Sequence, residues 1–247
     1  MKTIITLLVA MVTAAICFSC CNSQSTAKQG EKDSVVVDKH TMEVGIPFHG
    51  EKGSVGVALD LGLPSGTLWA DRNVGASSPE DYGNYFAWGE TSTKSNYDWS
   101  TYKYANGAPN KLTKYCGMSK FGNNGYTDSR TTLERSDDAA TANWGSDWCM
   151  PTQQQFQELK DNCAWTWTKR NGKDGYEVKG KNGNSIFLPA AGDRIGSGFE
   201  SAGWGHYWLS SFCPSSGCQL VFNSGGVNFH NGAWRSNGFS VRPVLCR

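Results

Sequence analysis

The segment Gly217–Arg247, GCQLVFNSGGVNFHNGAWRSNGFSVRPVLCR, predicts short antiparallel strands joined by tight turns. Its apolar residues alternate with small and polar ones, which is typical of strands because successive side chains point to opposite faces of a sheet. We expect a turn at Asn223–Gly226 and a last strand that begins at Phe239 and Val241 and ends at Pro243. The apolar residues that mark the two strands beside the turn are Cys218, Leu220 and Phe222, which share one face, followed by Val227 and Phe229.

Upstream, the segment PTQQQFQELKDNC (Pro151–Cys163) predicts the one clear helix of the chain, over about Gln153–Asn162. Thr152 can accept a hydrogen bond at the helix N-terminus, and Gln155 follows three residues later as its capping-box partner. The residues that share one face at helical spacing are Phe156, Leu159 and Cys163.

A second hairpin is expected between this helix and the closing segment. Asn182-Gly183 is a strong two-residue turn signal, and it lies between two short alternating runs. The apolar residues of these runs are Tyr176 and Val178 before the turn, and Ile186 and Leu188 after it. Short strands, one or two helices and long ordered loops predict an α+β domain over residues 55–247.

Composition limits the functional classes. The chain has 247 residues, of which 38% are hydrophobic, and this is enough for one ordinary core. Its formal net charge is +1, with basic and acidic residues intermixed, so we expect no nucleic-acid partner. Glycine (29) and tryptophan (10) are abundant, whereas charged residues make up only 18%. Such a composition favours turns, short-strand cores and aromatic contact surfaces.

The N-terminus has the pattern of an export signal. Lys2 precedes an apolar run that ends at Phe18, which is too short for a comfortable membrane span. The adjacent cysteines that follow resemble a bacterial lipobox, so we expect residues 1–19 to be a lipoprotein signal and Cys20 to be lipidated, with Cys21 as the alternative. Plain secretion with a cut further downstream is the competing interpretation. Residues 20–54 are polar and patternless and predict a flexible tether.

Cysteine and histidine spacing argues against a metal site. The domain has an even number of cysteines in a chain expected to leave the cytoplasm, so disulfides are allowed, but their pairing stays open. No Cys-x-x-Cys occurs among them, and the four histidines form no pair at metal-ligand spacing, so no metal or cofactor is expected. The cysteines are Cys116, Cys149, Cys163, Cys213, Cys218 and Cys246, and the histidines are His40, His49, His206 and His230.

Four stretches carry a resemblance to a known family: DLGLPSGTLWADRNVGASSPEDYGNYFAWGET (60–91), DDAATANWGSDWCMPTQQQFQEL (137–159), NGNSIFLPAAGDR (182–194) and GFSVRPV (238–244). Together they resemble the major paralogous domain family of fibrobacters and Bacteroidetes lipoproteins. That resemblance implies a fold similar to C-type lectin-like domains and formylglycine-generating enzymes, with a small twisted antiparallel sheet and a loop-rich face. It also implies an outer-membrane lipoprotein of the cell envelope, displayed at the cell surface.

The closing segment also resembles the variable region of proteins diversified by retroelements, and this resemblance implies a ligand-binding region over residues 207–240. The expected framework positions are Tyr207, Trp208, Ser210, Ser211, Phe222, Gly225, Val227, Arg235 and residues 241–244. The expected ligand-binding positions are Phe212, Cys213, Ser215, Ser216, Gln219, Val221, Gly226, Phe229, His230, Ala233 and Trp234. These combine rigid aromatic groups with adaptable polar ones, as antibody-like contact surfaces do.

The resulting hypothesis is a membrane-anchored, non-catalytic binding protein for a protein or glycan ligand. One alternative is a structural or adhesive module of a surface assembly. A more remote alternative is a formylglycine-generating oxidase, because Cys213 and Cys218 are spaced like a reactive pair. However, no neighbouring base or cation would lower their pKa, so a structural disulfide, or two free cysteines produced by randomisation, is favoured over catalysis. Arg242 is expected to bind an ion-pair partner or backbone groups, and Asp137 and Asp138 to cap a helix or turn rather than to bind calcium.

Overall fold

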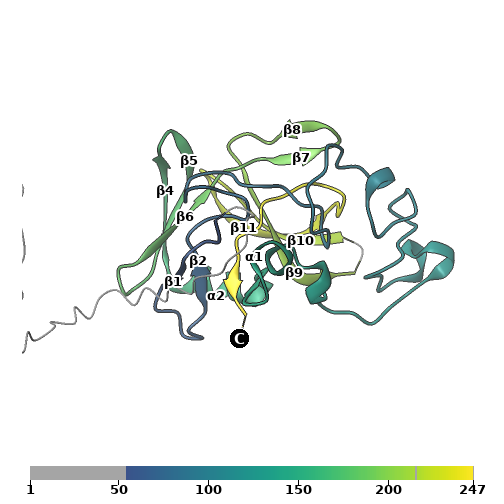
Figure 1. Ribbon diagram of the computed structural model, residues 1–247, viewed down its shortest axis with the longest axis horizontal. Coiled ribbons are helices and arrows are strands. Elements are labelled where there is room, and N and C mark those ends of the chain that lie inside the picture. Colours follow the sequence, from purple (N-terminus) through teal and green to yellow (C-terminus); the bar gives the residue numbers. More distant parts are fainter. Residues whose placement is uncertain (1–53, 215, 247) are drawn as a thin grey trace, which may run out of the picture. The chain divides into compact units, whose positions relative to one another are not determined.

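The computed structural model describes residues 54–214 and 216–246, which form a mixed domain of small antiparallel sheets and two α-helices (Figure 1). The expectations for the signal, for lipidated Cys20 and for the tether lie outside the described residues, apart from residue 54. Among the residues that are described, no helix is long and apolar enough to cross a membrane.

Four sheets replace the single small sheet that was expected. The first has the order β1-β2-β12-β3, and it pairs strands from the start and the end of the domain: β1 (Ala58–Asp60), β2 (Leu68–Ala70), β12 (Val244–Leu245) and β3 (Trp148–Cys149). The second joins β4 (Ala164–Arg170), β5 (Lys173–Lys179) and β6 (Ser185–Pro189). The third is the hairpin of β7 (Asp193–Ile195) and β8 (Gly198–Glu200). The fourth has the order β11-β10-β9 and comprises β9 (Gly205–Cys213), β10 (Ser216–Asn223) and β11 (Gly226–Ala233).

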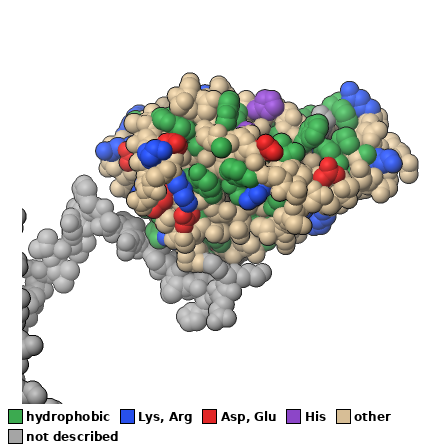
Figure 2. All heavy atoms as spheres, turned by 90° about the horizontal axis from the view of Figure 1, so that it is seen from above, with side chains coloured by type: hydrophobic (Ala, Val, Ile, Leu, Met, Phe, Trp, Pro, Cys, Tyr) green, Lys and Arg blue, Asp and Glu red, His purple; other side chains and the backbone are tan. Residues whose placement is uncertain are grey.

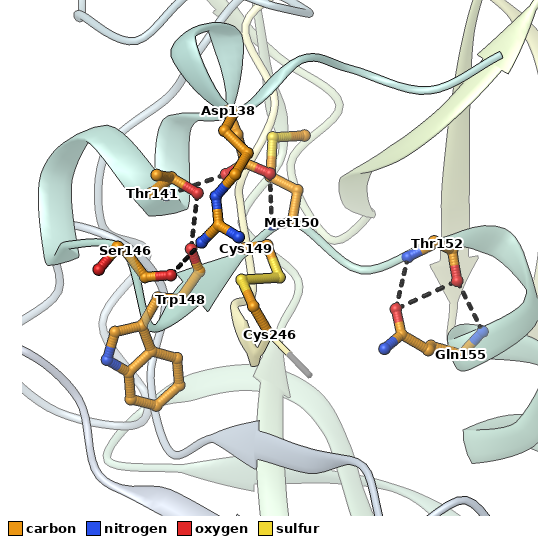
Figure 3. Close-up of a disulfide and its surroundings, with 10 residues drawn as sticks. Asp138, Thr141, Ser146, Trp148, Cys149, Met150, Thr152, Gln155 and Cys246 are labelled. Carbon is orange, nitrogen blue, oxygen red and sulfur yellow. Dashed lines mark hydrogen bonds between the residues drawn. A yellow bond between two sulfur atoms is a disulfide. The ribbon is translucent and has the colours of Figure 1, made fainter.

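The predicted helix is confirmed as α2 (Gln153–Asn162). The Thr152 hydroxyl accepts from the Gln155 backbone N–H at 3.2 Å, and the Gln155 side chain accepts from the Thr152 N–H at 2.9 Å (Figure 3). The capping box therefore satisfies donors at the exposed end of the helix. Phe156 and Leu159 are fully buried on the expected face.

A second, shorter helix, α1 (Ala139–Trp144), has Asp138 at its N-cap. Asp138 accepts from the Thr141 N–H at 3.0 Å and, through its other oxygen, from the Met150 N–H at 2.8 Å (Figure 3). The capping role predicted for Asp138 is thus confirmed. Asp137 instead points into a cluster of phenol hydroxyls and accepts from Tyr115 Oη at 2.7 Å.

Both predicted hairpins are confirmed, but the predicted last strand is wrong. Phe239 forms a single bridge to Phe86, and Ser240 a single bridge to Tyr207, so this stretch contacts two distant segments rather than one continuous partner. The true last strand, β12, begins after Pro243, where Val244 pairs with both Trp69 and Cys149.

Residues 71–138 contain no β-strand, yet they are ordered by aromatic packing. Edge-to-face ring pairs run through this region, with centroid separations of 5.4 Å for Trp99–Tyr102, 6.1 Å for Tyr102–Tyr104 and 5.7 Å for Tyr104–Tyr115. Such pairs are favourable beyond the burial of their surface. The aromatic residues therefore supply packing contacts in a long segment that has no sheet ladder.

Two disulfides join four of the six domain cysteines. Cys149 of β3 pairs with Cys246 just beyond β12, with Cα atoms 5.6 Å apart, and so fixes the end of the described chain (Figure 3). Cys213 pairs with Cys218 across the bend between β9 and β10. Cys116 and Cys163 carry free thiols. The structural disulfide favoured for Cys213 and Cys218 is therefore present.

Candidate ligand-binding surface

Strand pairing fixes which side chains of the β9–β10–β11 sheet point toward the core. Leu220 of β10 lies opposite Tyr207 of β9 and Phe229 of β11. Leu220 and Tyr207 are fully buried, and Phe229 is partly buried against the same apolar cluster. Phe229 therefore faces inward, where the Lys160 ammonium of α2 lies 5.9 Å from its ring centre.

The neighbouring residues point to the other side of the sheet because strand side chains alternate. Gln219 lies opposite Trp208 and His230, and Val221 lies opposite His206 and Asn228. Trp208 is fully buried, and its ring stacks on that of Phe239 with a centroid separation of 4.1 Å. This face of the sheet is therefore covered near β9 and open toward β11. We call the set His206, Gln219, Val221, Asn228 and His230 the outer face.

A row of hydrogen bonds crosses the outer face. The Nδ1 atom of His206 lies 2.8 Å from the Gln219 amide oxygen, and the Gln219 amide nitrogen lies 3.4 Å from Nδ1 of His230. An amide oxygen only accepts and an amide nitrogen only donates. This arrangement therefore makes His206 Nδ1 a donor and His230 Nδ1 an acceptor. Gln219 is only 5% exposed, and both the oxygen and the nitrogen of its side-chain amide have hydrogen-bond partners.

Trp204 extends this surface beyond the predicted region. Its ring stacks on His206 with a centroid separation of 6.3 Å, and the residue is 43% exposed. Figure 2, which looks onto the side of β7 and β8, shows hydrophobic side chains on both sides of a histidine. Sequence reasoning missed Trp204 because the family resemblance placed the start of the region at Tyr207. A tryptophan between two glycines was the signal that could have indicated it.

Arg235 holds the bend between β9 and β10 in place. Its fully buried guanidinium donates to three backbone carbonyls, those of Tyr115 and Cys213 at 2.7 Å and that of Ser216 at 2.9 Å. The guanidinium carbon also lies 5.5 Å from the centre of the Phe212 ring. Burial lowers the pKa of Arg235, and its guanidinium nitrogens donate to the three carbonyls named above.

Arg242 performs a similar role further along the chain, and its predicted backbone-binding role is confirmed. It donates to the carbonyls of Ala70 at 3.1 Å and Phe187 at 2.7 Å, and to the Asn73 side-chain oxygen at 2.9 Å. Burial lowers its pKa to about 10. Both arginines thus connect loops and strands that are far apart in sequence, and neither faces solvent.

The structure separates the predicted ligand-binding positions into distinct environments. His230 and Trp234 are exposed, with Trp234 at 60%, whereas Cys213, Gln219 and Ala233 are buried. Ser215 lies outside the described residues. The partly exposed positions are Phe212, Ser216, Val221, Gly226 and Phe229. Gln219, Val221 and His230 meet on the outer face, while Phe229 lies on the opposite side of the sheet.

The predicted framework positions are mostly buried. Gly225 is exposed in the hairpin turn, and Ser211 and Val227 are partly exposed. The buried members are Tyr207, Trp208, Ser210, Phe222, Arg235 and residues 241–244. No group of three or more histidine, cysteine or acidic side chains suited to a metal ion occurs in the described part of the chain.

Comparisons of the chain with protein-family models, with curated proteins and with solved structures found no match.

Proposed function

We propose that this protein is a non-catalytic binding protein that contacts a protein or glycan ligand through the exposed part of residues 207–240, together with Trp204. The observation that carries the proposal is the contrast between Trp234 and Arg235. Trp234 is 60% exposed, whereas the next residue is fully buried and bonded to three carbonyls. A large aromatic group held in solvent by a rigid support is the kind of anchor that dominates binding interfaces.

The outer face adds polar specificity to this aromatic anchor. His230 and Asn228 are exposed on the edge strand β11, and Gln219 holds His206 and His230 in fixed orientations. Rigid side chains lose little conformational entropy on binding. A fold of the C-type lectin-like type, within the major paralogous domain family, is part of the same proposal and rests on the four sequence stretches.

The experiment is a comparison of variants on arrays of purified glycans and envelope proteins. The full-length chain in detergent is expected to bind at least one arrayed molecule, and W234A and H230A are each expected to weaken that binding about tenfold or more. V57A is the matched control, because Val57 is 41% exposed and lies outside the C-terminal segment. Equal binding by W234A, H230A and V57A would place the contact elsewhere, and the absence of any bound molecule would favour a structural module.

Diversification by a retroelement is a further part of the proposal. Most of the expected framework positions are buried, whereas most of the described contact positions are exposed or partly exposed. This difference supports diversification, because exposed positions tolerate substitution whereas core positions do not. Randomisation at Cys213, Gln219 or Ala233 would disturb a disulfide, a buried amide network or a close strand contact. We therefore expect changes chiefly at His230, Trp234 and the partly exposed positions.

Attachment to the outer membrane through Cys20 is proposed on the sequence pattern alone. The two disulfides are in keeping with a domain that matures outside the cytoplasm. Metabolic labelling with an alkyne fatty acid tests the anchor, with C20S and C21S as paired variants. Label lost in C20S and kept in C21S is the expected outcome, and label kept in both variants would contradict it.

A further inference from the structure

A pocket on another part of the surface is lined by residues that all lie before the C-terminal segment. It has a volume of about 390 Å³ and lies between residues 83–97 and the turn of the β7–β8 hairpin. Volumes of this order are at the lower end of ligand pockets in proteins, which suits one small polar molecule. The lining residues used below are Asn84, Tyr85, Lys94, Tyr97, Arg194 and Ser197.

The walls of the pocket are fixed by hydrogen bonds. The backbones of Tyr97 and Gly196 exchange two bonds, at 2.7 and 2.9 Å, and the Tyr97 hydroxyl donates to the Tyr85 carbonyl at 2.6 Å. Arg194 and Gly238 also exchange two backbone bonds, both at 2.9 Å. The pocket is therefore built before a ligand arrives, and the backbone N–H groups of Tyr97, Gly196 and Arg194 are already bonded.

One positive charge in the pocket is compensated and the other is not. Lys94 forms an ion pair with Glu90 at 3.0 Å and donates to the Thr101 carbonyl at 3.2 Å. Arg194 lies over the rings of Tyr85 and Phe199, with 5.3 Å from its guanidinium carbon to each ring centre. Among the described residues, no carboxylate lies within 4.0 Å of the Arg194 guanidinium and no acceptor is bonded to it.

We propose that this pocket binds the carboxylate of an acidic sugar through Arg194. A guanidinium presents a planar fork of donors that matches a carboxylate, and two aromatic rings beneath it hold the fork in position. The side chains of Ser197 and Asn84 at the rim can exchange hydrogen bonds with sugar hydroxyls.

The charge count favours a carboxylate over a phosphate ester. The pocket offers one uncompensated cation, whereas a phosphate monoester carries roughly −1.5 to −2 charges at neutral pH. Because the nearby backbone donors named above are already bonded, they cannot neutralise the second charge of a phosphate. A ligand with a single negative charge therefore fits the pocket best.

The test is titration calorimetry of the full-length chain in detergent with glucuronate, N-acetylneuraminate, glucose and inorganic phosphate. At least one of the two sugar acids is expected to bind, whereas glucose, which has no carboxylate, is not expected to bind. Added salt is expected to weaken the binding of the sugar acid. R194Q is expected to reduce the affinity about tenfold or more, and R194K to fall between R194Q and the wild type. R170Q is the matched control, because the Arg170 side chain is 51% exposed on β4.

Several outcomes would overturn the inference: no binding of either sugar acid, equal binding of glucose, tighter binding of phosphate, or an R194Q variant that binds like the wild type. Thermal unfolding of R194Q, monitored by near-ultraviolet circular dichroism, verifies that the fold persists. W234A is expected to leave sugar-acid binding unchanged, so failure here is distinguishable from failure of the proposed C-terminal surface.

Discussion

The guanidinium carbon of Arg235 lies 4.7 Å from the centre of the Trp88 ring. Trp88 belongs to the long loop that precedes α1, and Arg235 follows β11, so the contact joins the aromatic loop to the candidate binding surface. The Trp88 indole also donates to the Leu209 carbonyl at 2.8 Å. The loop is therefore a structural support of the sheet rather than a separate appendage.

Replacement of Arg235 should destabilise the whole domain. R235M removes the guanidinium donors of three backbone carbonyls, two of which belong to the buried residues Tyr115 and Cys213. We expect the free energy of unfolding to fall by about 3 kcal/mol or more, measured by urea denaturation. R170M, on the exposed side of β4, should change it by no more than about 0.5 kcal/mol. Similar stability for the two variants would show that the Arg235 bonds contribute little.

Acid should destabilise the domain through Asp137. Burial raises the pKa of this carboxyl, but hydrogen bonds from Lys114, Tyr104 and Tyr115 outweigh burial and lower the pKa to about 2. In the unfolded chain an aspartate titrates near pH 4. The stability that Asp137 contributes is thus fully present above about pH 4 and is lost as the pH falls toward 2.

The variant D137N tests this pH dependence. Its unfolding free energy should be lower than that of the wild type at pH 6 and should change less between pH 4 and pH 2, as measured by urea titrations at each pH. D174N is the control, because the Asp174 side chain is 44% exposed and forms an ion pair with Lys169. If the unfolding free energy of D137N falls between pH 4 and pH 2 as steeply as that of the wild type, other carboxylates cause the acid sensitivity.

The two disulfides should contribute unequally to stability. Cys149 and Cys246 are 97 residues apart, whereas Cys213 and Cys218 are 5 apart. In the chain-entropy account the stabilisation grows with the length of the closed loop, to about 5 kcal/mol for the long loop and about 2 kcal/mol for the short one. The double variant C149S/C246S should therefore unfold at lower urea than C213S/C218S. The reverse order would contradict the chain-entropy account for this domain.

Loss of the capping box should weaken α2 by a smaller amount. T152A removes the side-chain acceptor of the Gln155 N–H, and we expect a loss of about 1 kcal/mol in unfolding free energy. Q157A is a suitable control, because Gln157 lies on the polar side of the same helix and its side chain donates to Asp161 at 2.7 Å. A loss in Q157A as large as that in T152A would show that the capping box is not the cause.

Local sequence signals predicted the elements that depend on local chemistry. The bounds of α2 followed from Thr152 and Gln155, and the β5–β6 turn followed from Asn182-Gly183. The last strand was mispredicted because Phe239 pairs with Phe86, more than half the chain away, and no local pattern encodes that choice. Tertiary partners decide strand identity wherever a strand is only two or three residues long.

The candidate site was only partly predictable for the same reason. His230 and Gln219 were expected contact positions, but the hydrogen-bonded row with His206 depends on the register of three strands. The opposite orientations of Phe229 and His230 follow from that register as well. The Arg194 pocket could not be foreseen, because its two walls are about 100 residues apart in sequence and meet through tertiary contacts, among them the bridge between Tyr97 and Gly196 and the contact of Arg194 with the Tyr85 ring.

We propose that residues 207–240 combine a fixed buried frame with an exposed contact surface that varies among copies of the protein. The decisive measurement is deep sequencing of the coding region for residues 207–247 across a population of the source strain, together with its flanking DNA. We expect substitutions to concentrate at His230, Trp234 and the partly exposed positions, to match adenines of a nearby template repeat, and to spare Arg235 and Arg242. An invariant segment without a template, or substitutions spread equally over buried and exposed positions, would contradict the claim.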